Sequence, residues 1–173
     1  MLIIKIRGGY KKFNLIDLFE PVLAGGDLQA KKLEEGNIPL ISSGHTGNGV
    51  CKYINNQYDK SNLFRDNLIT VDMFGKAFYQ PKPFYAVSHG RINILLPKFD
   101  LDEDLAMFFV ALFNRIFTKK YAFNEMCSQT ALKKEQIFLP VDKQGMINFT
   151  FMRDRIKSIK LKVNRKLKQI SVA

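Results

Sequence analysis

Three glycines, a histidine and a Lys-Tyr pair follow a short apolar run in the stretch ISSGHTGNGVCKYI, residues 41–54. A glycine-rich loop of this kind can hold a phosphate, bind a metal ion or only turn the chain. Gly44–Gly49 is not followed by the Lys-Ser or Lys-Thr of a nucleoside-triphosphate loop, and no GxGxxG opens a helix here as a dinucleotide site requires. The two histidines, His45 and His89, have no neighbouring acidic cluster, which argues against a zinc or iron site.

The rest of the sequence offers no arrangement of residues for catalysis. No GxSxG or comparable setting for a nucleophile occurs. The carboxylates Asp66 and Asp72 are not followed by the acid-x-Lys segment of a metal-dependent nuclease. An Asn-Pro-Pro-Tyr or Asp-Pro-Pro-Tyr segment for methyl transfer to a base is also missing. We therefore predict a binding protein, with no catalytic residue, metal or cofactor in this chain.

Net charge points to the kind of partner. The chain has 27 Lys+Arg against 16 Asp+Glu, a formal net charge of +11. Residues 151–173 contain a single acidic residue, Asp154, among the basic residues Arg153, Arg155, Lys157, Lys160, Lys162, Arg165, Lys166 and Lys168. Such a surplus favours a polyanionic partner, although a solvated helix face in a basic protein would have the same composition.

Two segments have the residue types that read duplex DNA, where short or planar polar groups contact base edges and cations contact phosphates. The glycine loop offers His45, Thr46 and Asn48 for bases, and Lys52 and Tyr53 for phosphates, while its glycines let the backbone approach closely. The segment GKAFYQPKPFYAVSHGR offers Lys76, Tyr79, Gln80, Lys82, His89 and Arg91; Gln suits adenine, and Arg or Lys suits guanine. We expect both segments side by side on a rigid scaffold. A tight hairpin with polar decoration is the alternative for the glycine loop.

Length and composition set the frame for these segments. A chain of 173 residues with 46% hydrophobic and 25% charged content forms one domain with a sizeable core. No apolar stretch reaches the roughly 20 residues that cross a bilayer, and the opening residues lack a signal-peptide pattern. We expect a cytoplasmic protein without membrane association, in which Cys51 and Cys127 are reduced structural thiols.

Short apolar runs between turn-forming residues predict a domain rich in β-structure. Strands are expected at 37–42, 67–75, 91–96 and 137–139, with Pro39 favouring an edge or a strand start for the first. A short helix or turn is expected at 13–19, a loop at 22–36, and a loop or edge strand at 77–86.

A long helix is predicted to begin after Asp100, an N-cap with Glu103 as its capping-box partner. Its apolar residues recur on one face over about four turns; they are Leu101, Leu105, Phe108, Phe109, Leu112, Phe113, Ile116 and Phe117. We assign the aromatic residues of this face to the core and not to base stacking.

The C-terminal segment has a different period. Apolar residues at heptad a and d spacing, with Lys166 at the one broken position, are Phe149, Met152, Ile156, Ile159, Val163 and Ile170. This spacing predicts a helix that binds another helix, and the expected partner-binding residues are Ile156, Ile159, Val163 and Ile170. The alternative is a single amphipathic helix docked on its own domain.

Four segments, in this order, resemble the target-recognition domain of the DNA-specificity subunit of type I restriction-modification systems and of related restriction enzymes. The segments are FNLIDLFEPVLAGG, NIPLISSGHTGNGV, DNLITVDMFGKAFYQPKPFYAVSHGRINILLP and SQTALKKEQIFLP, and together they cover about residues 12–160. In the family the closing segment usually has a glycine near the position of Ser128-Gln129, and this sequence has none there.

The resemblance implies an α+β fold, with a twisted, mainly β-sheet target-recognition domain over 12–148 and a coiled-coil-type helix, cut short, over 149–173. It implies a non-catalytic half subunit, a fragment or a truncated reading frame that reads a short half-site in double-stranded DNA. DNA-methyltransferase subunits, which bring S-adenosylmethionine, and a restriction subunit in some systems would be its partners, and the helix could also mediate self-association.

Two other functions are compatible with the sequence. In the first, an assembly or inhibitor subunit acts through the C-terminal helix without reading DNA. In the second, a single-strand RNA binder stacks bases on its exposed aromatic side chains; the candidates are Phe78, Tyr79, Phe84 and Tyr85.

Overall fold

An antiparallel sheet with the strand order β2-β8-β5-β6 lies at the centre of the fold in the computed structural model, which describes residues 9–24, 28, 30–44, 46–55, 63–87 and 92–170. Its strands are β2 (Phe19–Leu23), β8 (Ile92–Pro97), β5 (Leu68–Asp72) and β6 (Ala77–Gln80). All residues of β5 and the first four of β8 are buried. A strand that is covered on both faces has mainly apolar residues at consecutive positions, which is why both strands could be predicted from the sequence.

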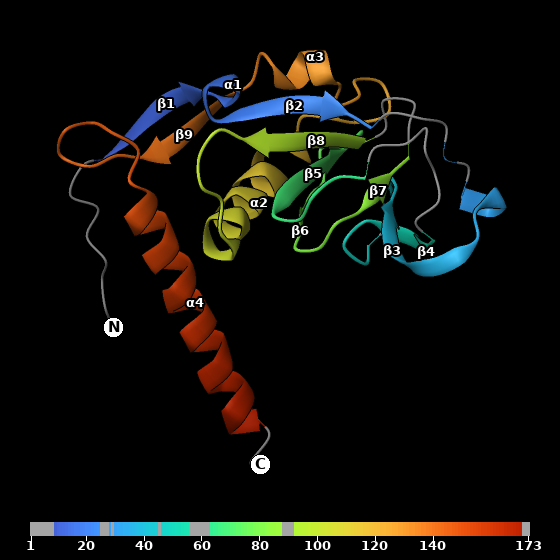
Figure 1. Cartoon of the computed structure of the whole chain (residues 1–173). Helices are drawn as coiled ribbons and strands as arrows, with labels where there is room; N and C mark the ends of the chain where they lie inside the picture. The colour runs from blue at the N-terminus through green and yellow to red at the C-terminus, as the bar shows by residue number, and fades with distance from the viewer. Residues whose placement is uncertain are drawn as a thin grey trace.

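Helix α2 (Glu103–Phe117) packs against this sheet (Figure 1) and supplies the main core. Phe109, Phe113 and Phe117 are fully buried, so the prediction that these aromatics belong to the core is confirmed. The Phe19 ring contacts Phe109 edge-on, with centroids 5.0 Å apart. Such aromatic pairs contribute roughly 0.5–1.5 kcal/mol beyond the area they bury.

The predicted start of α2 is wrong by two residues. Asp102, and not Asp100, is the N-cap, because its backbone is extended and its carboxylate accepts the Leu105 N–H at 2.9 Å. Leu101 is buried before the helix begins, so it belongs to the connection that leads into α2. The apolar period alone does not distinguish a buried residue before the cap from one after it.

A second sheet has the order β4-β3-β7, formed by β3 (Glu35–Ile41), β4 (Val50–Ile54) and β7 (Tyr85–Ala86). A short 3-10 helix, η1 (Ala30–Lys32), precedes β3 within the segment that we predicted as loop. Strand β3 is central in this sheet and Pro39 lies within it, so neither the edge position nor the strand start predicted from Pro39 is found. However, β7 pairs only with Leu40 and Ile41, so β3 has a single paired neighbour at Pro39, where the missing N–H costs no ladder bond on the β7 side.

The termini of the domain meet in a third pairing. Strand β1 (Tyr10–Asn14) runs antiparallel to β9 (Gln136–Pro140), and the one-turn helices α1 (Leu15–Leu18) and α3 (Gln129–Leu132) lie beside them. The short helix or turn predicted at 13–19 is thus α1, preceded by the last two residues of β1 and followed by the first residue of β2. Val22 and Leu23, predicted as loop, belong to β2.

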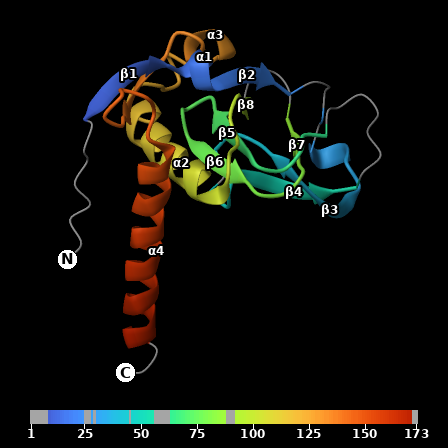
Figure 2. The same cartoon turned by 60° about the vertical axis from the view of Figure 1, so that its left-hand side comes forward.

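The last helix, α4 (Phe149–Ile170), leaves the domain (Figures 1 and 2). Its first turns pack on α2: Met152 is fully buried, Arg153 forms an ion pair with Asp102, and the Lys160 Nζ lies 2.7 Å from the Asp104 Oδ1. Every residue from Leu161 to Ile170 is exposed. The fold is therefore α+β, as predicted, with a helix that is docked over its first half and free of the domain over its second.

Candidate nucleic-acid interface

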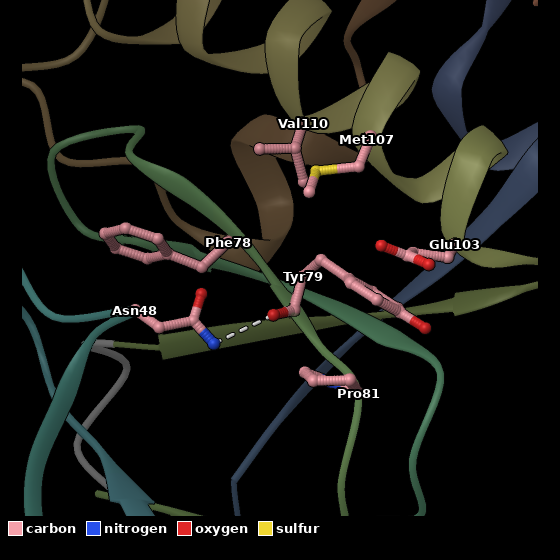
Figure 3. Close-up of a pocket in the computed structure, with 7 residues that line it drawn as sticks. All are labelled: Asn48, Phe78, Tyr79, Pro81, Glu103, Met107 and Val110. Carbon is pink, nitrogen blue, oxygen red and sulfur yellow. Dashed lines mark hydrogen bonds between the residues drawn. The ribbon is translucent and has the colours of Figure 1, made fainter. Parts of the chain in front are cut away.

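The glycine loop and strand β6, which are about 30 residues apart in sequence, are in direct contact (Figure 3). The Asn48 Nδ2 donates to the backbone oxygen of Tyr79 at 2.9 Å and to the Gln80 Oε1 at 3.2 Å. In return, the Gln80 Nε2 donates to the backbone oxygen of Asn48 at 3.2 Å. The expectation that the two segments lie side by side is confirmed for their described residues.

The glycine loop is a tight turn between β3 and β4. The Ser42 N–H donates to the Gly49 oxygen at 2.9 Å, and the Val50 N–H donates to the Gly47 oxygen at 3.0 Å. Asn48 and Gly49 both take the left-handed backbone conformation, with φ of 55° and 76°. The hairpin alternative thus describes the backbone correctly, while the hydrogen bonds of Asn48 show that its side chain connects the loop to β6.

Asp72, at the end of β5, holds the other end of the loop. Its side chain is 4% exposed, and it accepts the N–H groups of Phe74 and Lys76, each at 2.9 Å, and that of Gly44 at 3.3 Å. One buried carboxylate therefore closes the β5–β6 turn and fixes the start of the glycine loop.

Gln80 lies below the surface. It is 2% exposed, and its Nε2 also donates to the Thr70 Oγ1 at 3.0 Å, which in turn donates to the Phe78 oxygen at 3.4 Å. We predicted that Gln80 would contact a base, but in this conformation no base edge can reach its amide. The reason is its position on the inward face of β6, beside Thr70 of β5.

The outer edge of β6 is covered by side-chain amides. The Asn114 of α2 accepts the Ala77 N–H at 2.8 Å and donates to the Ala77 oxygen at 3.0 Å, while Asn48 binds the Tyr79 oxygen. An uncovered edge strand pairs readily with other chains. Here two asparagines satisfy the edge, and they fix β6 between α2 and the glycine loop.

The other predicted contact residues have different surroundings. Thr46 and Lys82 are exposed, and 55% of Tyr53 is exposed. Lys76 is half-buried with its Nζ 5.5 Å from the Phe78 ring centroid, and the Lys52 Nζ donates to the Leu33 oxygen at 2.6 Å, so Lys52 supports the second sheet. His45, His89 and Arg91 lie outside the described residues.

The Tyr79 hydroxyl is hydrogen-bonded within the domain and lies near several carboxylates. Its hydroxyl donates to the Asn67 Oδ1. Partial burial, followed by the nearby carboxylates of Glu103, Asp66 and Asp102, raises the pKa of this phenol above its ordinary value. Tyr79 is therefore a neutral hydrogen-bonding group at physiological pH.

A groove of about 390 Å³ runs between β6, the glycine loop and the first turns of α2 (Figure 3). Its lining is largely apolar and consists of Asn48, Phe78, Tyr79, Pro81, Glu103, Met107 and Val110. It contains no nucleophile next to a base. Within the described residues, no three His, Cys, Asp or Glu side chains are grouped as a metal site would need.

Stacking of single-stranded RNA on the aromatic residues is not supported. Phe84 is fully buried among residues of both sheets, and Tyr85, a residue of β7, is 3% exposed in the core of the second sheet. Two of the four proposed stacking faces are therefore inaccessible to a base.

Sequence reasoning missed the residues that position the interface: Thr70, Asp72 and Asn114. Their signal was present, because each is a polar residue within a buried strand or a helix of apolar neighbours. A buried polar group needs a hydrogen-bonding partner, so such residues are expected to connect segments.

The C-terminal helix presents its predicted seam only in part. Ile156 is half-buried, whereas Ile159, Val163 and Ile170 are 43%, 48% and 74% exposed. Leu161 and Leu167 are exposed as well, at 59% and 58%. The docked alternative holds for the first turns of α4, and an unpartnered apolar row continues beyond them. No helix of the described chain is long and apolar enough to span a bilayer.

Residues 8–171 match the family described as Type I restriction modification DNA specificity domain. Comparison with curated protein sequences found no match.

Several solved structures have a similar fold. The S subunit of the type I restriction-modification system from M. genitalium is 15% identical, with a TM-score of 0.61 over 93% of this chain and 40% of that one. The HsdS subunit from Thermoanaerobacter tengcongensis is 10% identical, with a TM-score of 0.61 over 95% and 41%. A chain from a structural study of type I R-M complex assembly and conformational transition is 10% identical, with a TM-score of 0.64 over 98% and 43%. The present chain thus spans about two fifths of their length.

Proposed function

The chain belongs to the type I restriction-modification DNA specificity domain family, whose members are non-catalytic, and from this premise we propose that it reads one short half-site in duplex DNA. The glycine loop would present its tip to base edges, and exposed cations such as Lys82 would contact the phosphates beside them. A chain with this role would act in the cytoplasm, where its DNA lies.

The contact between the glycine loop and β6 is the single observation that carries the proposal. Base recognition requires polar groups held at fixed positions, and here two segments from different parts of the chain are joined by three side-chain hydrogen bonds. The net charge of +11 adds the phosphate attraction that any duplex binder needs.

The experiment is selection from a pool of randomised duplexes, with the full chain alone and together with the methyltransferase subunits of a type I system. We expect one short motif to be enriched. Phosphate attraction alone gives non-specific dissociation constants of roughly 10⁻⁴ to 10⁻⁶ M at physiological salt, so the selected duplex must bind more tightly than that. Enrichment of no motif under either condition would contradict the proposal.

We further propose that α4 binds other helices. The row Ile159, Val163 and Ile170 is exposed in the isolated chain, and helices with such a/d rows pair by packing these side chains together. The partners would be methyltransferase subunits, which bring S-adenosylmethionine, a restriction subunit in some systems, or a second copy that completes a two-domain subunit.

The exposed row also favours a second candidate function, assembly or inhibition through α4 without DNA readout. Deleting residues 161–173 separates the two candidates. It leaves the buried Met152 and the ion pairs of Arg153 and Lys160 in place, so the domain should stay folded. Both candidates predict loss of partner binding, but only the first predicts that the remaining chain keeps weak, salt-sensitive affinity for duplex DNA.

A further inference from the structure

We propose that a buried bridge from Asn48 through Gln80 to Thr70 sets the base preference of the glycine loop, and that Gln80 acts as a positioning residue without touching DNA. The inference rests on the proposed function. It concerns how the half-site is read, and it assigns to Gln80 a role different from the adenine contact that its residue type suggests.

The hydrogen-bonding groups of the Gln80 amide are all used inside the protein. Its two N–H groups donate to the Thr70 Oγ1 at 3.0 Å and to the backbone oxygen of Asn48 at 3.2 Å, and its Oε1 accepts from the Asn48 Nδ2. A glutamine that contacts adenine bidentately needs one free N–H and one free oxygen at the surface. Gln80 is 2% exposed and has no N–H to spare.

Asn48 is restricted in the same way despite its exposure. Its amide has two N–H groups, and these donate to the Tyr79 oxygen and to the Gln80 Oε1. A bidentate contact between Asn48 and adenine needs one free N–H, so it would require one of these two bonds to break. The bridge also stabilises the left-handed backbone of Asn48, with φ of 55°, which a residue with a Cβ adopts at a cost.

The tip of the loop is held between two such attachments. Asp72 binds the Gly44 N–H on one side, and the bridge holds Asn48 on the other. Thr46 and Gly47 lie between them and are exposed. The backbone oxygens of Thr46 and Gly47 accept the N–H groups of Asn48 and Val50, so the Thr46 hydroxyl is the side-chain polar group that these two residues offer to a base. A loop that is fixed beforehand loses less conformational entropy when it binds.

Isosteric substitutions within the bridge test this role. Thr70→Val replaces the hydroxyl that accepts from Gln80 with a methyl group of similar size, whereas Thr70→Ser keeps the hydroxyl. Gln80→Met keeps the length of the side chain and removes all of its amide bonds. Lys82→Ala, two residues along the chain on an exposed site, is the matched control outside the bridge.

Two measurements are made on the full chain. The first is amide hydrogen exchange at Asn48 and Val50, whose N–H groups are bonded within the loop. We expect exchange about tenfold faster in Gln80→Met and Thr70→Val, which corresponds to about 1.4 kcal/mol of local stability, and wild-type exchange in Thr70→Ser and Lys82→Ala. Unchanged exchange in Gln80→Met would overturn the inference without bearing on the proposed function.

The second measurement is the ratio of affinities for the selected duplex and for a scrambled duplex. We expect this ratio to fall about tenfold in Gln80→Met and Thr70→Val, and the loss of base preference to affect several base pairs of the site. In Thr70→Ser the ratio should equal that of the wild type. Affinity for the scrambled duplex should stay within about twofold, since no phosphate contact is lost. Lys82→Ala should weaken both affinities and leave the ratio unchanged. A purely stabilising role would lower the melting temperature and leave the ratio intact.

The outcomes that contradict the inference differ from those that contradict the proposed function. If Gln80→Met keeps the wild-type ratio, or changes preference at one base pair while loop exchange is unchanged, Gln80 is not a positioning residue. If the wild-type chain itself enriches no motif, the proposed function fails and the inference fails with it.

Discussion

Gly49→Ala is expected to destabilise the domain because Gly49 combines a left-handed backbone with a crowded position. Its φ is 76°, and a Cβ at this residue would lie 3.2 Å from the Ile41 Cγ2 and 3.3 Å from the Phe78 Cδ2. Gly47 in the same loop has neither constraint, since its φ is outside the left-handed region and nothing lies within 4 Å of its Cβ position. The two alanine variants thus form a matched pair.

The magnitude follows from these two terms. A left-handed φ costs a residue with a Cβ roughly 1–2 kcal/mol. The two contacts are shorter than the ~3.5–4.0 Å that carbon atoms prefer, so Ile41 and Phe78 must shift by a few tenths of an ångström, which adds a smaller cost. We expect a loss of about 2 kcal/mol in the free energy of unfolding, and a fall of roughly 4–8 °C in Tm for a chain of this length.

Urea and thermal unfolding, followed by circular dichroism, measure this difference. Gly47→Ala should stay within about 0.5 kcal/mol of the wild type, as surface substitutions usually do. The Gly44→Ala variant, at φ 78° with nothing within 4 Å, should lose only the backbone part. Equal stabilities of Gly49→Ala and Gly47→Ala would refute the strained loop conformation.

Three further predictions follow from the charges and thiols. Lys76→Ala and Lys82→Ala should each weaken binding to all duplexes alike and reduce the slope of log K against log salt by about 0.9, in anisotropy titrations; a sequence-dependent loss would refute a phosphate contact. Asp102 is partly buried, which favours its neutral form, but hydrogen bonds from the Leu105 N–H and from Arg153 outweigh this and lower its pKa below 3.8. Because the folded-state pKa is depressed, the wild type should have a larger free energy of unfolding than Asp102→Asn above about pH 4, and this difference should be lost as the pH falls through the folded-state pKa. A difference that does not depend on pH would contradict the ion pair with Arg153. Burial raises the pKa of the Cys127 thiol to about 12, so this thiol should react with a disulfide reagent at pH 8 only at the rate of unfolding, and more slowly than the half-buried Cys51.

Much of the fold could be predicted because burial repeats along the chain. The fully buried β5 and the first four residues of β8 are mainly apolar, and the 3.6-residue period of Phe109, Phe113 and Phe117 marks the inner face of α2. The errors lie at boundaries, as at Asp100 against Asp102, and at Pro39. At Pro39 the neighbouring strand β7 is too short to pair with the proline, because it pairs only with Leu40 and Ile41. The local sequence around Pro39 does not show how long its neighbouring strand is.

The sequence predicted which two segments form the candidate interface, but not the role of each residue in them. The glycines and cations located both segments, since flexible backbone and charge are local properties. Whether Gln80 faces solvent or Thr70 depends on which side of β6 is covered, and a strand of four residues with mixed character gives no clear alternation. The same holds for Asn48, whose exposed position conceals an amide already bonded to β6.

The sequence by itself determined a basic α+β domain of the type I restriction-modification DNA specificity family, because composition, apolar period and the order of its motifs are properties of the chain. Tertiary structure alone decided which polar side chains already have hydrogen-bonding partners inside the domain. Hydrogen bonds between Asn48, Gln80 and Thr70 depend on atoms that come within about 3 Å only after the two sheets pack. The residue type determines which hydrogen bonds a side chain can form, and the fold determines whether those bonds are already made inside the protein.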